Sequence, residues 1–230
     1  MEYIIKKTGC FSTVPEKLLG KIINGKGQFN KIDYLLFTHN HKDHMDLQLA
    51  IKYISENKNS TLIMPKYKEG KKLHEYNDQI SKLKNKILID SPIGEIKEIE
   101  FNNIKIKYFK AIHDVEDYKN INNYCYIIYL GSRTFLHLGD ASPNYDFFSK
   151  ILSKEKIDYA LLNFPYSTLP ASRRIVREIV CPNKLIVIHL PFESDDEFRY
   201  RRISMKVLER YKNSLPDTTL FLESMQEIID

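Results

Sequence analysis

A histidine-rich stretch, Thr38 to Asp46, follows the apolar run Tyr34 to Phe37 and constrains the possible folds more than any other feature of the sequence. The apolar run is typical of a buried strand. Asp46 is a good N-cap residue and predicts that a helix begins there, with an apolar face made by Leu47, Ala50, Ile51 and Ile54. The histidines therefore lie in a loop between a strand end and a helix start, where folded scaffolds commonly present catalytic groups.

The spacing within this loop suits metal binding. His39 and His41 are two residues apart, so in extended backbone both side chains leave on the same side and can bind one ion. Asp43 and His44 follow after the chain turns and can face a second position nearby. Neutral imidazole and carboxylate are the usual ligands of zinc and related ions. A polar loop with incidental histidines is the alternative, but three of the chain's seven histidines gather here, which favours a metal site.

This His-x-His-x-Asp-His pattern resembles the signature of the metallo-β-lactamase fold superfamily. Members of that family add a lone histidine, an aspartate after a glycine, and a last histidine, each at a strand end. His113, Asp140 and His189 match these three in the family's order, and each follows an apolar run. The resemblance covers the chain from about Lys31 to the end.

The resemblance implies an α/β (α+β) fold, a four-layer αββα sandwich in which residues 1–230 form a single domain. It also implies two divalent ions, with ligands His39, His41 and His113 for the first, Asp43, His44 and His189 for the second, and Asp140 bridging both. Zinc is the expected metal, and similar ligand sets accept manganese or iron. Two ions about 3.5–4 Å apart can share a hydroxide. Asp43 would orient it, so Asp43 and Asp140 are the expected catalytic residues.

The composition fits one globular domain and excludes several other classes. Hydrophobic residues make up 43% of the 230, and no apolar run reaches the about 18 residues of a membrane span. The three cysteines are scattered and the N-terminus lacks an apolar signal sequence, so we expect a cytoplasmic protein. The net charge of +5 favours an anionic small-molecule substrate, although such a charge is more often only a solvated surface.

The N-terminal part is shorter than the family pattern predicts. Only Tyr3 to Ile5 reads as a strand, where the family usually has two or three strands and a final aspartate. A short helix is expected to begin near Thr13 and continue to Ile23, with Pro15 in its first turn. The first sheet is therefore expected to be reduced and to expose an edge, which a second copy of the chain could cover in a homo-oligomer.

The middle of the chain alternates strands with polar segments. A polar helix is expected from Lys68 to Lys84, with His74 on its surface. Strands are expected at residues 60–64, 86–89, 95–101, 104–109, 124–130 and 134–138, with hairpin turns at 102–103 and 131–132. His137 lies within a strand, which indicates that it is structural or supports a metal ligand and does not itself bind the metal. The acidic residues Asp114, Glu116 and Asp117 form either a solvated turn or a substrate contact.

The C-terminal part is expected to contain two basic helices. After a helix at 143–152 and a strand at 159–163, the loop Phe164 to Thr168 offers Tyr166, Ser167 and Thr168 as candidate substrate contacts. A helix over Pro170 to Val180 is expected to direct Arg173, Arg174 and Arg177 outward. After the strand that ends at His189, a helix over Asp195 to Lys212 is expected to bury Phe198, Ile203, Val207 and Leu208 and to expose Arg199, Arg201, Arg202, Lys206 and Arg210. A strand is expected at 218–222.

Three functions fit these features. The loop most resembles the branch with N-acyl-phosphatidylethanolamine phospholipase D and the ascorbate-phosphate lactonase-like hydrolases, which implies a metal-dependent hydrolase of a small anionic ester, lactone or phosphodiester. A nuclease of the same fold would use the two basic helices. Their arginines are interleaved with Glu178 and Glu197, which makes nucleic acid an unfavoured partner. A scaffold or sensor without catalysis is the third, and the seven filled ligand positions count against it.

Overall fold

The structure is a computed structural model that describes residues 14–66 and 74–229. It divides into two compact units, which for the described residues run to Asp90 and from Ser91 onward, and each unit is treated separately below. The expected strand at Tyr3 to Ile5 and the first part of the helix expected from Lys68 lie outside the described residues.

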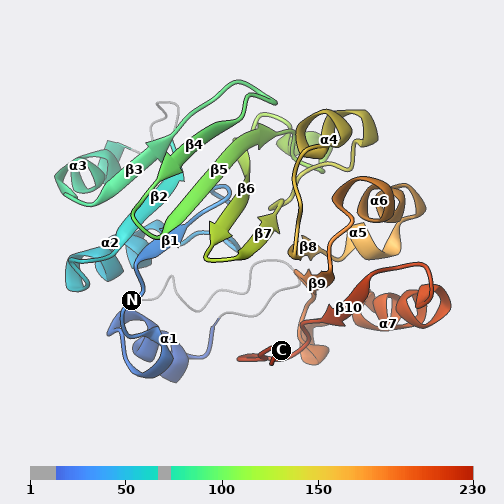
Figure 1. The fold of residues 1–230 in the computed structure, drawn as a ribbon. Coiled ribbons are helices and arrows are strands. Elements are labelled where there is room, and N and C mark those ends of the chain that lie inside the picture. The colour runs from blue at the N-terminus through green and yellow to red at the C-terminus, as the bar shows by residue number, and fades with distance from the viewer. Residues whose placement is uncertain (1–13, 67–73, 230) are drawn as a thin grey trace. The chain divides into compact units, whose positions relative to one another are not determined.

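The first unit contains a parallel three-stranded sheet with the order β1-β2-β3 (Figure 1). Its strands are β1 (Tyr34–Leu36), β2 (Thr61–Pro65) and β3 (Lys86–Ile89), and its helices are α1 (Glu16–Ile23), α2 (Leu47–Glu56) and α3 (His74–Lys82). A single 3₁₀ turn, η2 (Gly27–Phe29), joins α1 to the sheet. Parallel strands require crossover connections, and the helices α2 and α3 supply them.

The core of this unit forms where the apolar face of α2 meets β2. Ala50, Tyr53 and Ile54 of α2 pack with Leu62 and Met64 of the strand, and Leu47 and Ile51 lie partly buried against them. The side chain of Asp46 accepts a hydrogen bond from the backbone N–H of Leu49 at 3.0 Å. The predicted N-cap is therefore confirmed, and it fixes the start of α2 directly after the histidine-rich loop.

The second unit contains a seven-stranded mixed sheet with the order β10-β9-β8-β7-β6-β5-β4 (Figure 1). The strands are β4 (Lys97–Glu100), β5 (Ile104–Ala111), β6 (Asn123–Leu130), β7 (Arg133–His137), β8 (Tyr159–Asn163), β9 (Lys184–Ile188) and β10 (Asp217–Leu220). The strands from β4 to β7 pair antiparallel, which confirms both predicted hairpins. From β7 to β10 the pairing is parallel, so β7, β8 and β9 all end at the same edge of the sheet.

Helices cover one face of this sheet and bury its largest core. They are α4 (Tyr145–Leu152), α5 (Pro165–Thr168), α6 (Pro170–Ile175) and the π-helical turn η4 (Val176–Val180). The unit also contains α7 (Tyr200–Tyr211), which contacts α5, and the 3₁₀ turns η3 (Glu116–Tyr118) and η5 (Glu193–Asp195). Phe148 of α4, Tyr166 of α5 and Ile175 of α6 pack against inward residues such as Phe109 and Leu162. The expectation of a mixed α/β fold with two sheets is confirmed. The face-to-face packing of the sheets stays a prediction.

Two predicted features of the C-terminal part are wrong. The segment Phe164 to Thr168 is not a loop, because Pro165 starts the single helical turn α5. The last helix begins at Tyr200, five residues later than predicted, and its buried side chains are Arg201 and Ser204. Phe198 and Ile203, predicted to be buried, are 61% and 45% exposed.

Two arginines predicted to be exposed are buried because backbone carbonyl groups bind them. Arg201 donates from Nη1 to the carbonyl oxygen of Leu222 at 2.7 Å and pairs through Nη2 with Glu223 at 3.0 Å. Arg173 donates to the carbonyl oxygen of Thr168, and its guanidinium lies 4.0 Å from the ring centroid of Tyr211. Hydrogen bonding of this kind allows a charged side chain to leave solvent. Among the described residues, no helix is both long enough and apolar enough to cross a membrane.

Candidate metal centre

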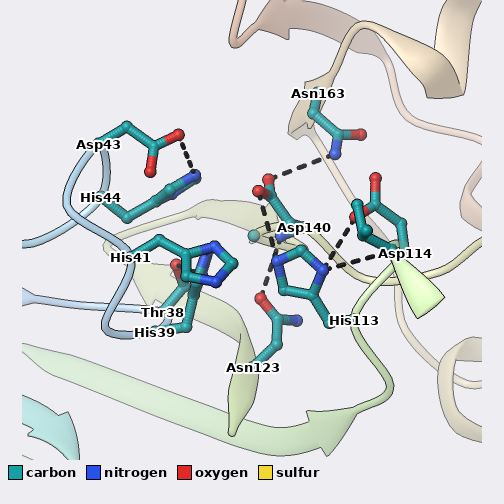
Figure 2. Close-up of polar contacts among 12 residues, drawn as sticks. Thr38, His39, His41, Asp43, His44, His113, Asp114, Asn123, Asp140 and Asn163 are labelled. Carbon is teal, nitrogen blue, oxygen red and sulfur yellow. Dashed lines mark hydrogen bonds and ion pairs between the residues drawn. The ribbon is translucent and has the colours of Figure 1, made fainter. Parts of the chain in front are cut away.

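In the first unit, four predicted ligands lie close together in the loop after β1 (Figure 2). His39 Nε2 lies 3.1 Å from His41 Nδ1, and the ring centroids of His39 and His44 are 4.0 Å apart. Asp43 Oδ2 lies 3.6 Å from His44 Nε2. The loop therefore brings three imidazole rings and one carboxylate together.

Local hydrogen bonds hold this loop in place. Thr38 Oγ1 lies 2.9 Å from His39 Nδ1, so the hydroxyl group orients that ring. The carbonyl oxygen of His41 accepts from the backbone N–H groups of His44 and Met45 at 3.0 and 2.8 Å. This closes the turn that the spacing predicted, and Met45 anchors it in the core of the unit.

In the second unit, the carboxylate of Asp140 faces two histidines. Its Oδ2 atom lies 3.7 Å from Nε2 of His113 and 3.8 Å from Nε2 of His189. Its Oδ1 atom accepts a hydrogen bond of 3.4 Å from Nδ2 of Asn163, at the end of β8 (Figure 2). The two oxygens thus have different surroundings: an amide holds one, and two imidazole rings approach the other.

The backbone around Asp140 is fixed by neighbouring strands. Gly139 turns the chain just after β7 with a φ of 56°, a conformation that glycine adopts without strain. The N–H of Asp140 donates to Oδ1 of Asn123 at 3.0 Å, and its carbonyl oxygen accepts from the N–H of Asp114 at 2.9 Å. Asn123 also donates from Nδ2 to the carbonyl oxygen of Leu138 at 3.1 Å. The turn is therefore held from both sides.

His113 comes two residues after β5 and pairs with Ala141 in an isolated antiparallel bridge. Its Nδ1 atom lies 3.0 Å from Oδ1 of Asp114, and the N–H of Val115 lies 3.3 Å from the same nitrogen. The edge of its ring contacts Tyr118, with 5.5 Å between the ring centroids. These contacts direct Nε2 toward Asp140.

His189 directly follows β9 and has a φ of 61°. Side chains other than glycine rarely adopt this left-handed conformation, although histidine does so more often than most. The turn bends the chain sharply at the strand end and brings His189 Nε2 within 3.8 Å of Asp140.

Other residues weighed in the sequence have structural roles. Nδ1 of His137 accepts from the N–H of Gly139 at 2.9 Å. This agrees with the expectation that His137 supports the turn before Asp140 and does not itself bind a metal. Tyr166 and Ser167 are each 1% exposed, and their hydroxyl groups donate to the carbonyl oxygens of Ala141 and Phe164. Burial raises the pKa of Tyr166 well above its ordinary value, so this hydroxyl group remains a donor. The prediction that Tyr166 and Ser167 contact substrate is therefore wrong.

Sequence reasoning missed two asparagines that position Asp140. Asn123 begins β6 and Asn163 ends β8, and both are buried. Asparagine is depleted in strands, so a buried asparagine next to an apolar run was the available signal. Both amides connect to Asp140, one at its backbone and one at its side chain.

The donor set suits a transition metal. The first unit offers three imidazoles and a carboxylate, and the second offers two imidazoles and a carboxylate. These are the ligand types of zinc, iron and manganese sites. The structure therefore gathers the predicted ligands into two clusters, one in each unit.

Comparisons with known proteins support this fold. A family model described as the β-lactamase superfamily domain matches residues 13–161. No curated protein matches the sequence. Three solved structures with a similar fold are a putative metal-dependent hydrolase from Parabacteroides distasonis, the metallo-β-lactamase fold protein YhfI from Bacillus subtilis, and CmlA, a diiron β-hydroxylase from Streptomyces venezuelae.

The first two structures have the same size range as this chain, and the third is much larger. The Parabacteroides protein is 18% identical with a TM-score of 0.57, covering 85% of this chain and 79% of its own. YhfI is 18% identical with a TM-score of 0.55, and the match covers 94% of this chain and 86% of YhfI. CmlA is 14% identical with a TM-score of 0.60, covering 83% of this chain, which spans only 44% of CmlA. Because the family match includes more than half of the sequence, the chain belongs to the β-lactamase superfamily.

Proposed function

We propose that this protein is a metal-dependent hydrolase that holds two divalent ions through its histidine and aspartate ligands. The observation that carries the proposal is the position of Asp140, whose Oδ2 atom faces His113 and His189 at 3.7 and 3.8 Å. One carboxylate between two imidazoles is the arrangement expected of a residue that bridges two ions, each bound by one of the histidines.

The distances fit the ligand geometry of zinc. Zinc binds imidazole nitrogen and carboxylate oxygen at about 2.0–2.2 Å, so two ligand atoms of one tetrahedral ion lie roughly 3.4 Å apart. The separations at Asp140 are close to this value and longer than a hydrogen bond. In the proposal, His39, His41 and His113 bind one ion, while Asp43, His44 and His189 bind the other.

In this mechanism the protein residues position the reacting groups. Bound divalent ions would supply Lewis acidity and lower the pKa of a water molecule to about 7. Asp140 would hold the site together through Oδ2 while Asn163 restrains Oδ1. The carboxylate oxygen of Asp43 that is not used for binding would accept a hydrogen bond from the attacking water and orient it.

The proposed substrate is a small anionic ester, lactone or phosphodiester. Support comes from the net charge of +5 and from the resemblance of the loop to phospholipase D-like and lactonase-like enzymes. A hydrolase is also the activity named for the similar Parabacteroides protein. Nucleic acid is a weaker candidate, because Arg173 and Arg201 are buried and cannot contact a phosphate backbone.

Zinc is the proposed metal, and iron is the main alternative because the similar CmlA is a diiron enzyme. We also propose a cytoplasmic location, since the two cysteines within the described residues are free thiols. A homo-oligomer that pairs through an outer strand of the three-stranded sheet is also proposed, and light scattering of the purified protein tests it.

The decisive experiment measures metal content per chain in protein purified without added metal, beside Asp140→Asn and the exposed control Asp146→Asn. We expect about two ions in the wild type and in the control, and fewer in Asp140→Asn. A screen of phosphodiester, lactone and thioester substrates on these three proteins then tests hydrolysis. Absence of bound metal after incubation with zinc, manganese or iron would reject the proposal.

A further inference from the structure

We propose that Gln226 closes the free edge of β10 and so prevents a second copy of the chain from pairing with this strand. β10 is an outer strand of the seven-stranded sheet in the part of the chain that the structure describes (Figure 1). An outer strand presents backbone N–H and C=O groups to which another strand can bind. The proposal concerns self-association of the protein and does not depend on the proposed metal chemistry.

The backbone groups at the end of β10 point alternately toward β9 and away from it. The N–H of Phe221, directly after β10, donates to the carbonyl oxygen of Val187 in β9 at 2.9 Å. Successive residues of an extended chain direct their N–H and C=O groups to opposite sides, so the groups of Leu220 and Leu222 face the free edge. These are the groups that an additional strand would bind.

The side-chain amide of Gln226 binds to both of these residues. Its Nε2 donates to the carbonyl oxygen of Leu220 at 2.9 Å, and its Oε1 accepts from the N–H of Leu222 at 2.9 Å. A neighbouring parallel strand would make the same two hydrogen bonds with one of its residues, placed opposite Phe221. The amide therefore occupies the position of one residue of an added strand.

A tight turn brings Gln226 back to the strand. The N–H of Gln226 donates to the carbonyl oxygen of Glu223 at 3.4 Å, and the N–H of Glu223 donates to Oε1 of Gln226 at 3.3 Å. Met225 within this turn has a φ of 65°, a conformation that residues other than glycine rarely adopt. Strained backbone persists where surrounding contacts fix it, and the bonds between the Gln226 amide and the strand are such contacts.

The start of β10 is protected in a different way. Pro216, directly before the strand, has no N–H to donate, and its carbonyl oxygen accepts from Oγ1 of Thr218 at 2.6 Å. Proline beside an outer strand and a segment that covers the edge are common protections against pairing with another chain. The Gln226 amide thus protects the end of an edge whose start is protected by Pro216 and Thr218.

The first test compares wild type with Gln226→Ala, which removes the amide, and with the control Ser224→Ala, at an exposed position in the same turn. Hydrogen exchange of the Leu222 N–H reports on its bond to Gln226 directly. We expect exchange to become roughly 10-fold faster in Gln226→Ala, as the loss of one hydrogen bond implies, and to stay unchanged in Ser224→Ala. Unchanged exchange in Gln226→Ala overturns the proposal.

Sedimentation velocity across a series of protein concentrations then measures self-association relative to wild type, so that association through the three-stranded sheet is common to all the proteins compared. We expect Gln226→Ala to self-associate roughly 10-fold more tightly, because an incoming copy no longer has to displace the amide. Faster exchange of Leu222 without tighter association overturns the proposal.

A second substitution shows whether the association uses the strand edge. The N–H of Thr218 faces the same side as the groups of Leu220, and proline at this position removes it. Gln226→Ala combined with Thr218→Pro should return to wild-type association, whereas Gln226→Ala combined with Thr218→Ala retains the N–H and should remain associated. Tight association that persists with Thr218→Pro overturns the proposal, because the copies would then not pair through β10.

Discussion

The backbone N–H of Asp140 donates to the side-chain oxygen of Asn123 at 3.0 Å, and the Asn123 amide donates in turn to Leu138 at 3.1 Å. One buried side chain therefore satisfies both a donor and an acceptor of the turn after β7. Replacing Asn123 by alanine removes this acceptor from the buried N–H of Asp140, at a cost of about 1–3 kcal/mol, whereas the carbonyl oxygen of Leu138 still accepts from the N–H of Ala141 at 3.2 Å. We expect Asn123→Ala to lower the free energy of unfolding by about 2 kcal/mol in urea titrations of the metal-free protein.

Asn183 supplies the control for this change. Its amide donates to Oδ1 of Asp158 at 2.9 Å, but it is exposed, so water replaces the lost bond. Asn183→Ala is expected to change the free energy of unfolding by less than about 0.5 kcal/mol. Equal effects of the two substitutions would show that the turn does not depend on Asn123.

The cap of α2 lies two residues after the proposed ligand His44, and we expect it to stabilise both the helix and the loop before it. Asp46→Ala removes the acceptor for the N–H of Leu49 and should lower the free energy of unfolding by about 1 kcal/mol. Asp46→Asn retains an acceptor and should preserve most of the stability. Lys52→Ala, on the exposed side of the same helix, serves as the control in thermal unfolding. A loss in Asp46→Asn as large as in Asp46→Ala would argue against capping.

The buried Arg201 connects the segment after His189 to the C-terminal segment. It donates to the carbonyl oxygens of Pro191 at 3.3 Å and Leu222 at 2.7 Å, beside its pair with Glu223. Arg201→Met preserves much of the volume but leaves these groups unpaired, and we expect a loss of about 2–4 kcal/mol. Arg201→Lys should recover only part of it, since a lysine cannot reproduce the branched donor geometry. The neighbouring exposed Arg202→Met is the control and should be nearly neutral.

A charged cluster between β5, β6 and the turn after α4 predicts a pH dependence of stability. Lys107 pairs with Glu155 at 2.7 Å, and Tyr129 donates to the same carboxylate. The hydrogen bond with Glu155 raises the pKa of Lys107, and burial followed by the contact with Glu155 raises the pKa of Tyr129. A group whose pKa is raised by folding stabilises the folded state below its unfolded pKa and loses this effect as the pH rises through the folded pKa.

The contribution of this cluster should therefore be complete below about pH 10 and decline above it. In urea titrations from pH 8 to pH 11, the stability difference between wild type and Glu155→Gln is expected to shrink as the pH rises. Glu178→Gln, which breaks the exposed pair with Arg174, should show a small difference at every pH. A difference for Glu155→Gln that stays constant to pH 11 would contradict the assignment.

Sequence reasoning worked best where the structure is local. The strand, turn and cap around His39 to Asp46 depend on contacts within a few residues, and the structure confirms them. The two positioning asparagines could not be predicted in the same way. Their contacts with Asp140 span 17 and 23 residues, and they exist only because β6, β7 and β8 pair in one register.

The last helix shows why periodicity alone misplaced some side chains. Apolar spacing placed Phe198 and Ile203 inside, but the helix begins only at Tyr200, after a left-handed residue at Arg199. Arg201 therefore lies on the inward face, where it donates to backbone carbonyl oxygens. A pattern of apolar residues does not predict such contacts. Where hydrogen-bond partners from distant segments are available, they outweigh the preference of an arginine for solvent.

His189 has a left-handed backbone conformation that lowers the stability of the fold, and its side chain is a proposed metal ligand. An L-residue there costs on the order of 1 kcal/mol, and glycine would relieve it. His189→Gly is thus expected to melt at a higher temperature than wild type when no metal is present, although it lacks a proposed ligand. A laboratory selection for thermal stability alone would accept that substitution, so stabilised versions of this chain are best screened with a metal-binding assay in parallel.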